Sequence, residues 1–205
     1  RRDFIQLSAL AVAGSFIPSP KPAAVSAGPA NEMLASSLLK NREEVQPISL
    51  EERQQRIAKA QRMMRNTNIR AVVLDAGTSM EYFTGLSWWP SERPMLVVIP
   101  DKADAAYIAP GFEESRLREL ISIGKKVYVW QEDESPYAAV LHALRDAGIS
   151  SGQVGLEERL RFFIFDGLRK SSGAFQWVSA DPVTVPCRMI KSPAEIALMK
   201  KASAI

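Results

Sequence analysis

The chain has 205 residues, 46% of them hydrophobic and 24% charged, which suits a globular domain large enough to bury a core. Its formal net charge of +3 falls to +1 when residues 1–27 are set aside, so charge gives no reason to expect a nucleic-acid partner. The single cysteine, Cys187, excludes an internal disulfide and a zinc site built from several thiolates.

The first 27 residues have the pattern of an export signal. Arg1 and Arg2 precede an apolar run over 7–17, and small residues follow up to the expected cleavage site at 25–27. The run is too short to span a bilayer as a helix, and the paired arginines resemble the twin-arginine export motif. We predict a signal peptide over 1–27 and a periplasmic or extracellular protein with no stable membrane span after cleavage. The alternative is a basic N-terminus before a buried helix.

Regular structure is predicted to begin at Ser49, after a linker with a weak helix over 28–48. Ser49 and Glu52 have the spacing of a capping box, which predicts a helix up to about residue 66. A short continuous apolar run over 71–74 predicts a buried strand, and a brief helix or turn over 78–83 follows it.

Strands and helices alternate along the chain from there to about residue 180. Two apolar runs around a polar loop, over 95–99 and 105–108, predict a hairpin. The remaining elements are predicted in the order helix 113–121, strand 126–130, helix 136–147, strand 153–156, helix 162–171 and strand 175–178. This alternation, broken by one hairpin, predicts an α/β fold with a mixed β-sheet flanked by helices.

Motifs for nucleotide binding and for catalysis are absent from the sequence. No glycine-rich phosphate loop is present, and the one histidine, His142, is too few for a His-based metal cage and has no partners for a Ser-His-Asp triad. Three acidic clusters stand at predicted loops or helix starts, where carboxylates favour the helix dipole. We expect solvated side chains rather than metal ligands in these clusters, which are Glu113-Glu114, Glu132-Asp133-Glu134 and Glu157-Glu158.

Two adjacent tryptophans, Trp88 and Trp89, lie in a predicted loop between Gly85 and Pro94, and Arg93 follows them. Large aromatic side chains are costly to leave in water, and neighbours along a chain point in different directions. Tryptophan and arginine are also enriched at interface hot spots. We therefore predict that Trp88, Trp89 and Arg93 form an interaction surface. The alternative is that both indoles pack in the domain's own core.

A second helix-start signal lies near the end of the sequence. Ser192 has the position of an N-cap, Pro193 that of the first helical residue, and Glu195 completes a capping box. An apolar stripe that includes Ile196 and Met199 follows, and the sequence stops within this predicted helix. We expect the stripe to pack on a further domain that the sequence does not contain.

These features resemble the creatinase/prolidase family of metallopeptidases. The segment 188–196, Arg-Met-Ile-Lys-Ser-Pro-Ala-Glu-Ile, is similar to the junction that opens the catalytic domain in aminopeptidase P, prolidase and creatinase. The segment 82–85, Tyr-Phe-Thr-Gly, and the order of elements over 50–205 are similar to the creatinase N-terminal domain. The resemblance implies a creatinase-like N-terminal domain over 49–186, then the first helix of a catalytic domain over 187–205.

In most members of that family the catalytic domain holds a pair of divalent metals, which activates a bridging water. The resemblance implies such a pair, of Mn, Co or Zn, in the missing catalytic domain and no metal in this chain. It also implies proline-containing peptides as substrates of the whole protein. The family's N-terminal domain mainly mediates oligomerisation and places a loop near a neighbouring subunit's active site. A homodimer or higher oligomer is therefore expected, with Trp88, Trp89 and Arg93 in that loop.

The first interpretation is thus the non-catalytic N-terminal domain of an exported Xaa-Pro metallopeptidase, inactive by itself. The alternative is a free-standing exported binding or oligomerisation module without enzyme activity. The predicted helix after Ser192 favours the first, because a complete module has no need of an unpartnered apolar half-helix.

Overall fold

The computed structural model describes Met33 and residues 46–203, and the structural statements below concern these residues. The chain divides into two units, residues 1–44 and 45–205. Arg1, Arg2 and the rest of the predicted signal peptide lie outside the described residues. The elements of the second unit are α2 (Leu50–Asn66), β1 (Ile69–Asp75), α3 (Thr78–Thr84), β2 (Leu96–Pro100), β3 (Ala106–Pro110), the 3-10 turn η1 (Gly111–Glu113), α4 (Glu114–Leu120), β4 (Lys126–Trp130), α5 (Pro136–Asp146), β5 (Gly152–Leu156), α6 (Phe162–Ser171), β6 (Phe175–Ser179), α7 (Asp181–Met189) and α8 (Pro193–Ala202).

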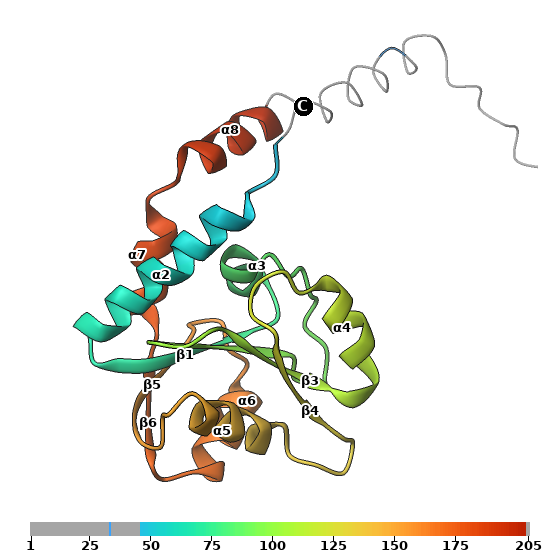
Figure 1. The fold of residues 1–205 in the computed structure, drawn as a ribbon, viewed down its shortest axis with the longest axis vertical. Helices are drawn as coiled ribbons and strands as arrows, with labels where there is room; N and C mark the ends of the chain where they lie inside the picture. The colour runs from blue at the N-terminus through green and yellow to red at the C-terminus, as the bar shows by residue number, and fades with distance from the viewer. Residues whose placement is uncertain (1–32, 34–45, 204–205) are drawn as a thin grey trace, which may run out of the picture. The chain divides into compact units, whose positions relative to one another are not determined.

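Six strands form one mixed sheet in the order β4–β3–β2–β1–β5–β6 (Figure 1). The central strand β1 pairs antiparallel with β2 on one side and parallel with β5 on the other. β2 also pairs antiparallel with β3, whereas β3–β4 and β5–β6 are parallel pairs. β2 therefore runs against its neighbours, as the predicted hairpin requires. The predicted fold class, a mixed sheet flanked by helices, is confirmed.

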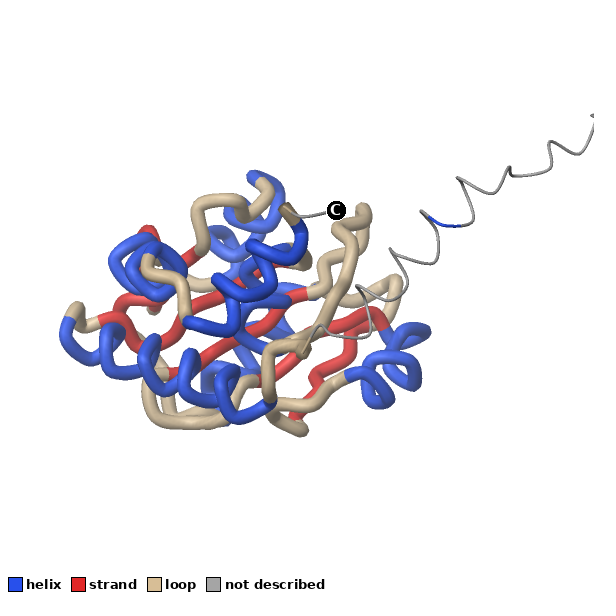
Figure 2. The backbone as a smooth tube through the Cα atoms, turned by 90° about the horizontal axis from the view of Figure 1, so that it is seen from above, coloured by secondary structure: helices blue, strands red, loops and turns tan. Residues whose placement is uncertain are grey.

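Helices cover both faces of the sheet, which explains the continuous apolar runs of its central strands. α2, α3, α4 and α7 lie over one face, and α5 and α6 lie over the other (Figures 1 and 2). Successive side chains of β1 enter alternate cores: Val72 and Leu74 the first, Ala71 and Val73 the second.

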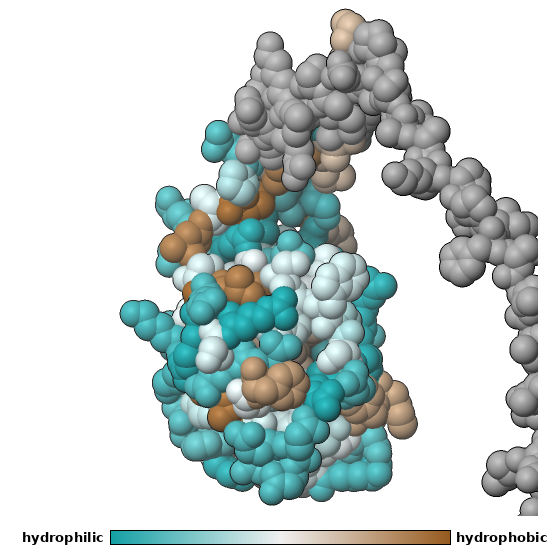
Figure 3. Space-filling model, turned by 90° about the vertical axis from the view of Figure 1, so that its right-hand side faces the viewer, coloured by the Kyte–Doolittle hydropathy of each residue, from teal (hydrophilic) through white to brown (hydrophobic). Residues whose placement is uncertain are grey.

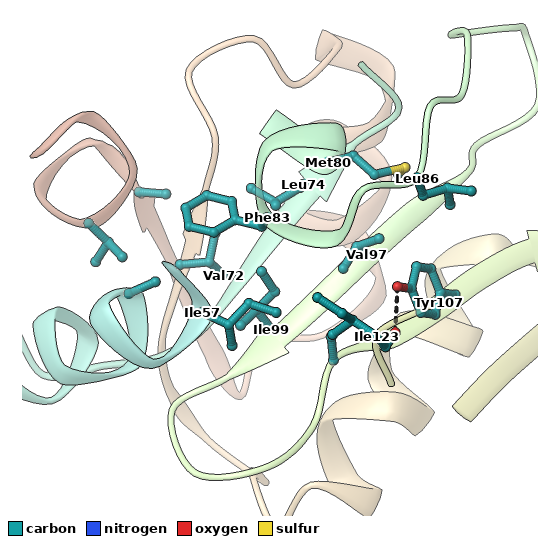
Figure 4. Close-up of a cluster of buried hydrophobic side chains, with 14 of the residues drawn as sticks. Ile57, Val72, Leu74, Met80, Phe83, Leu86, Val97, Ile99, Tyr107 and Ile123 are labelled. Atoms are coloured by element: carbon teal, nitrogen blue, oxygen red, sulfur yellow. Dashed lines mark hydrogen bonds between the residues drawn. The ribbon is translucent and has the colours of Figure 1, made fainter. Parts of the chain in front are cut away.

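The first core lies between the sheet and helices α2, α3 and α7 (Figure 4). Phe83 from α3 and Ile57 from α2 both contribute to it and are buried. The hydroxyl of Tyr107 donates to the carbonyl of Ile123 at 2.7 Å, so the polar atom of this buried ring has a partner. Burial raises the pKa of Tyr107 to about 12, and the hydroxyl therefore remains a neutral donor.

Capping at α2 differs from the prediction, and α5 lacks a side-chain cap. Ser49 Oγ accepts from the Glu52 amide at 3.1 Å, as a capping box requires. The Glu52 carboxylate, however, accepts from Arg56 and Ser192 instead of returning to the Ser49 amide. The predicted box at α2 is therefore half formed. Ser135 occupies the N-cap of α5, but its side chain makes no capping hydrogen bond.

Helix α4 buries only one of its two leucines. Leu117 is fully buried, and Ile121 packs partly against the first core. Leu120 is 48% exposed and stands at the last position of the helix. A seven-residue helix buries only one narrow stripe, which here runs through Leu117.

Helix α7 was absent from the sequence-based elements. It carries Pro182 in its first turn and Pro186 in its interior, and an interior proline normally breaks a helix. Long-range packing outweighs this preference, because Val183 and Cys187 belong to the first core. Lys59 on α2 donates to the carbonyl of Pro186 at 3.1 Å, which joins the two helices by a polar contact as well.

Candidate interaction surface

The three predicted surface residues lie in loop 85–95, between α3 and β2. This loop is at the end of the sheet where β1 finishes, because β2 starts there and runs back antiparallel. Gly85 ends α3 with a φ of 79°, a left-handed conformation that glycine adopts without strain. Leu86 and Met95 are both buried. The loop is thus held at both ends while its middle faces outward.

The two tryptophans have different surroundings. Trp88 is partly buried against the first core, and the guanidinium carbon of Arg116 lies 4.7 Å from its ring centroid. A cation at this distance is attracted by the face of the indole ring. Trp89 is 86% exposed. One indole therefore packs on the domain and the other lies in solvent. This arrangement falls between the two interpretations of the sequence, an interaction surface and a pair of core residues.

Arg93 already has ion-pair partners within the domain. Its Nε lies 2.6 Å from Glu132 Oε1, and its Nη1 contacts Glu92. The hydrogen bond from Arg93 lowers the pKa of Glu132, so this carboxyl is ionised at neutral pH. The guanidinium carbon is also 5.4 Å from the ring centroid of Phe112, which is 65% exposed. A carboxylate from a partner therefore competes with Glu132 and Glu92 for Arg93.

The group formed by these side chains is called here the aromatic–arginine surface, and its members are Trp88, Trp89, Arg93, Phe112, Arg116 and Glu132. Three of its members come from loop 85–95 and the others from the segments around α4 and after β4. On the side of the unit that carries α4, hydrophobic patches are small and separated by hydrophilic residues (Figure 3). Exposed aromatic rings flanked by arginines are typical of protein interfaces.

A buried ion pair holds loop 85–95 against the sheet. Asp75, the last residue of β1, is 2% exposed and accepts from Arg161 Nε at 2.7 Å and from Arg161 Nη2 at 3.0 Å. The remaining guanidinium nitrogen of Arg161 donates to the backbone carbonyl of Ser91 in the loop. Sequence reasoning missed this pair, since its partners are 86 residues apart and no local spacing connects them.

The predicted helix start near the end of the sequence forms as expected. Ser192 Oγ accepts from the Glu195 amide at 3.1 Å, and the Glu195 carboxylate accepts from the Ser192 amide at 2.9 Å. Pro193 occupies the first turn of α8. The capping box of Ser192 and Glu195 is therefore complete.

The same cap also attaches α8 to α2. Ser192 Oγ donates to Glu52 at 2.7 Å, and Arg56 lies 2.6 Å from Glu52 and 3.5 Å from Glu195. Burial acts to raise the pKa of Glu52, but the hydrogen bonds from Ser192 and Arg56 together with nearby arginine charge lower it overall. The ionised Glu52 carboxylate therefore links α8 to α2.

The described part of the chain has no group of three or more His, Cys, Asp or Glu side chains arranged to hold a metal ion. His142 is exposed on α5, with its Nε2 3.6 Å from Asp146. In the same part of the chain no helix is both long enough and apolar enough to cross a membrane.

Glu157 contradicts the expectation that the acidic clusters are solvated. It follows β5 directly, is 8% exposed, and its Oε2 has no hydrogen-bond partner among the described residues. Burial raises the pKa of Glu157 to about 7; Asp75 adds to the rise, while the Ser79 hydroxyl and Arg188 act against it. A sequence run of two acids gives no sign of this burial, because the residues beside the Glu157 carboxyl group, Ser79 and Arg188, come from α3 and α7.

The domain is thus a mixed six-stranded sheet between two helical layers. Residues 56–190 match the Creatinase/Prolidase N-terminal domain family. The chain belongs to this family.

Similar proteins show how much of a longer relative the chain spans. An uncharacterized peptidase from Schizosaccharomyces pombe is 31% identical over 152 residues, which are 67% of this chain and 32% of that protein. A prolidase from Thermococcus sibiricus has the same fold, with a TM-score of 0.65 and 22% identity over 74% of this chain and 41% of its own. The N-terminal domain of an Xaa-Pro dipeptidase from Lactobacillus brevis has a TM-score of 0.56 and 20% identity, and the match covers 65% of this chain and 98% of that chain. The chain thus spans well under half of the first two proteins.

Proposed function

We propose that the chain is the non-catalytic N-terminal domain of an exported Xaa-Pro metallopeptidase. Its family membership and the names of its relatives, a prolidase and an Xaa-Pro dipeptidase among them, support the class of the whole protein. In this proposal 49–186 is the N-terminal domain, and 187–205 opens a catalytic domain that binds proline-containing peptides and a pair of divalent metals. The metal ligands belong to that catalytic domain.

The exposed helix α8 supports a covalent connection to a further domain. Its N-terminus is attached to α2 by the Ser192–Glu52 contact, yet Ile196 and Met199 are 43% and 55% exposed. An apolar stripe on an attached helix gains free energy when another surface covers it. In this proposal the catalytic domain packs against the apolar stripe of α8.

The observation that carries the role of this domain is the exposure of Trp89 in a loop fixed at both ends. A rigid loop loses little conformational entropy when a partner binds, so an exposed indole on it is a suitable interface residue. We assign the aromatic–arginine surface to oligomerisation, next to the active site of a neighbouring subunit. Arg93 then exchanges Glu132 for a carboxylate across the interface, where two parallel hydrogen bonds distinguish arginine from lysine.

The test uses the natural gene together with the reading frame that follows residue 205. Trp89→Ala and Arg93→Lys should weaken the oligomer in light scattering or raise KM for an Xaa-Pro dipeptide, with melting unchanged. His142→Ala, an exposed change on the opposite layer, is the matched control. A stop codon directly after residue 205, with a chain that forms oligomers by itself, would contradict the peptidase proposal and support the free-standing module.

Two further measurements separate the parts of this proposal. The 205-residue chain with Mn, Co or Zn should not hydrolyse an Xaa-Pro dipeptide, and activity that persists through repeated purification would show a site in this domain. Replacing Arg1 and Arg2 by lysine in the complete precursor should block export. Export that continues would refute the twin-arginine route and leave the peptidase assignment untouched.

A further inference from the structure

A pocket of about 300 Å³ lies beside the carboxyl ends of β1 and β5. This volume is at the lower end of the range for small-molecule sites, roughly 300–1,000 Å³. The pocket is separate from the aromatic–arginine surface, since the two have no residue in common. Its polar lining consists of Ser79, Glu157, Glu158, Thr184, Arg188 and Lys191.

The topology of the sheet makes this position a natural crevice. β1 and β5 are adjacent and parallel, so their carboxyl ends meet at the same edge. The chain continues from β1 to α3, which packs in the first core. From β5 it continues to α6, which packs in the second core on the other face of the sheet. Where neighbouring parallel strands connect to opposite faces, the sheet edge opens, and ligands of α/β proteins bind at such switch points.

A buried carboxyl group with one unpaired oxygen lies in the wall of this pocket. Glu157 is 8% exposed, and its Oε2 accepts no hydrogen bond within the described chain. An unpaired buried carboxyl oxygen costs free energy that a donor from a ligand would recover.

Charges of both signs stand around this carboxyl group. Arg188 on α7 donates to Ser79 Oγ at 3.0 Å, and the Ser79 hydroxyl also interacts with Glu157. A cation and a carboxyl are thus separated by one hydroxyl group. Glu158 adds a carboxylate and Lys191 an ammonium group to the same lining. A complementary ligand carries an ammonium group and a carboxylate a few bonds apart.

We propose that this pocket binds the zwitterion of a small α-amino acid. The ligand's ammonium group donates to Glu157, with Glu158 beside it, and its carboxylate accepts from Arg188 and Lys191. Val185 and Met189, which complete the lining, give an aliphatic side chain an apolar contact. The site is independent of the proposed peptidase activity, and its test needs only this chain.

The test follows the amide resonances of the ¹⁵N-labelled 205-residue chain during titration with L-alanine at about pH 8, where Glu157 is ionised. Saturable shifts are expected at Ser79, Glu157 and Arg188. Ethylammonium and propionate, which each carry one of the two charged groups, should bind about tenfold more weakly. Equal affinity for either half-ligand would overturn the zwitterion assignment, and the absence of saturable shifts would overturn the site.

Variants separate the role of Glu157 from general charge effects. Glu157→Gln and Arg188→Gln should each weaken alanine binding about tenfold, whereas Glu119→Gln, an exposed change on α4, should have no effect. Binding to the natural chain should strengthen from about pH 6 to pH 8 as Glu157 ionises against the field of Asp75 and Glu158 and beside Arg188. This pH dependence should vanish in Glu157→Gln. A pH dependence that survives this substitution would refute the role of Glu157.

Discussion

Adjacent side chains at Trp88 and Trp89 meet different environments because the loop turns one toward α4 and leaves the other in solvent. Trp88 contacts the first core and lies under Arg116, whereas Trp89 is 86% exposed. Stability and binding therefore depend on different members of one tryptophan pair.

Alanine substitutions should reveal this difference in the isolated chain. Trp88→Ala should lower the free energy of unfolding by about 2 kcal/mol, less than for a fully buried tryptophan because part of the ring is already exposed. Trp89→Ala should change it by less than about 0.5 kcal/mol. Urea denaturation followed by circular dichroism measures both. A similar large loss for the two variants would mean that Trp89 also packs on the domain.

Glu157 should make the stability of the domain depend on pH near neutrality. Burial favours its neutral form and raises its pKa from 4.5 to about 7, so the folded state binds a proton that the unfolded state has released. Stability should therefore fall as the pH rises through this interval, by roughly 3 kcal/mol at most. Glu157→Gln should flatten the profile and be the more stable protein at about pH 8. Unfolding curves across the interval test this, and a profile unchanged by the substitution would contradict it.

Among the elements, α8 depends on contacts outside itself. Its apolar stripe has little burial within the described chain, and a ten-residue helix is marginal on propensity alone. The Ser192 side chain positions α8, because its hydroxyl oxygen caps the helix at Glu195 and its hydroxyl group also donates to Glu52 on α2. The same hydroxyl group thus stabilises the start of α8 and attaches the helix to α2.

Ser192→Ala should therefore loosen α8 without unfolding the domain. Loss of a serine cap costs about 1 kcal/mol, and here the contact with Glu52 is lost as well. Hydrogen exchange over 193–202 should become several-fold faster while exchange in the sheet stays the same. Ser203→Ala removes a hydroxyl from the other end of the same helix and is the control. Equal acceleration in both variants would show that the cap has no special role.

At the scale of the whole domain, the Asp75–Arg161 pair joins parts that belong to different layers. Asp75 ends the central strand β1, Arg161 stands at the N-cap of α6, and Ser91 lies in loop 85–95. The bidentate contact satisfies a carboxylate that is almost fully buried, and the same guanidinium also contacts the loop. At this edge of the sheet, Arg161 therefore holds both loop 85–95 and the start of α6 against β1.

Asp75→Asn should test this support. The amide keeps the shape of the side chain but leaves Arg161 without its charged partner, and the cost should be about 2 kcal/mol, since Arg161 is partly exposed and regains some hydration. Exchange in loop 85–95 should rise together with exchange at the start of α6. Asp133→Asn, at an exposed position after β4, should change neither. A stability loss without any change in the loop would disprove the link between loop and pair.

Local signals account for the parts of this domain that were predicted correctly. The apolar run of β1, the hairpin of β2 and β3, and the capping box at Ser192 each lie within a few residues, where periodicity and hydrogen-bonding spacing act directly. The junction and the Tyr-Phe-Thr-Gly segment pointed to the family for the same reason, since both are short and contiguous.

Packing between distant segments decided the rest. Glu52 exchanged its expected local partner for Ser192, 140 residues away, and α7 formed despite Pro186 because its apolar face covers the first core. The burial of Glu157 under α3 and α7 and the exposure of Trp89 likewise depend on which segments meet at one edge of the sheet. The sequence by itself determined the elements other than α7, the mixed sheet and the family, since these follow from short-range pattern. Only the tertiary structure determined which charged and aromatic groups are buried, because burial depends on neighbours that the chain brings together when it folds.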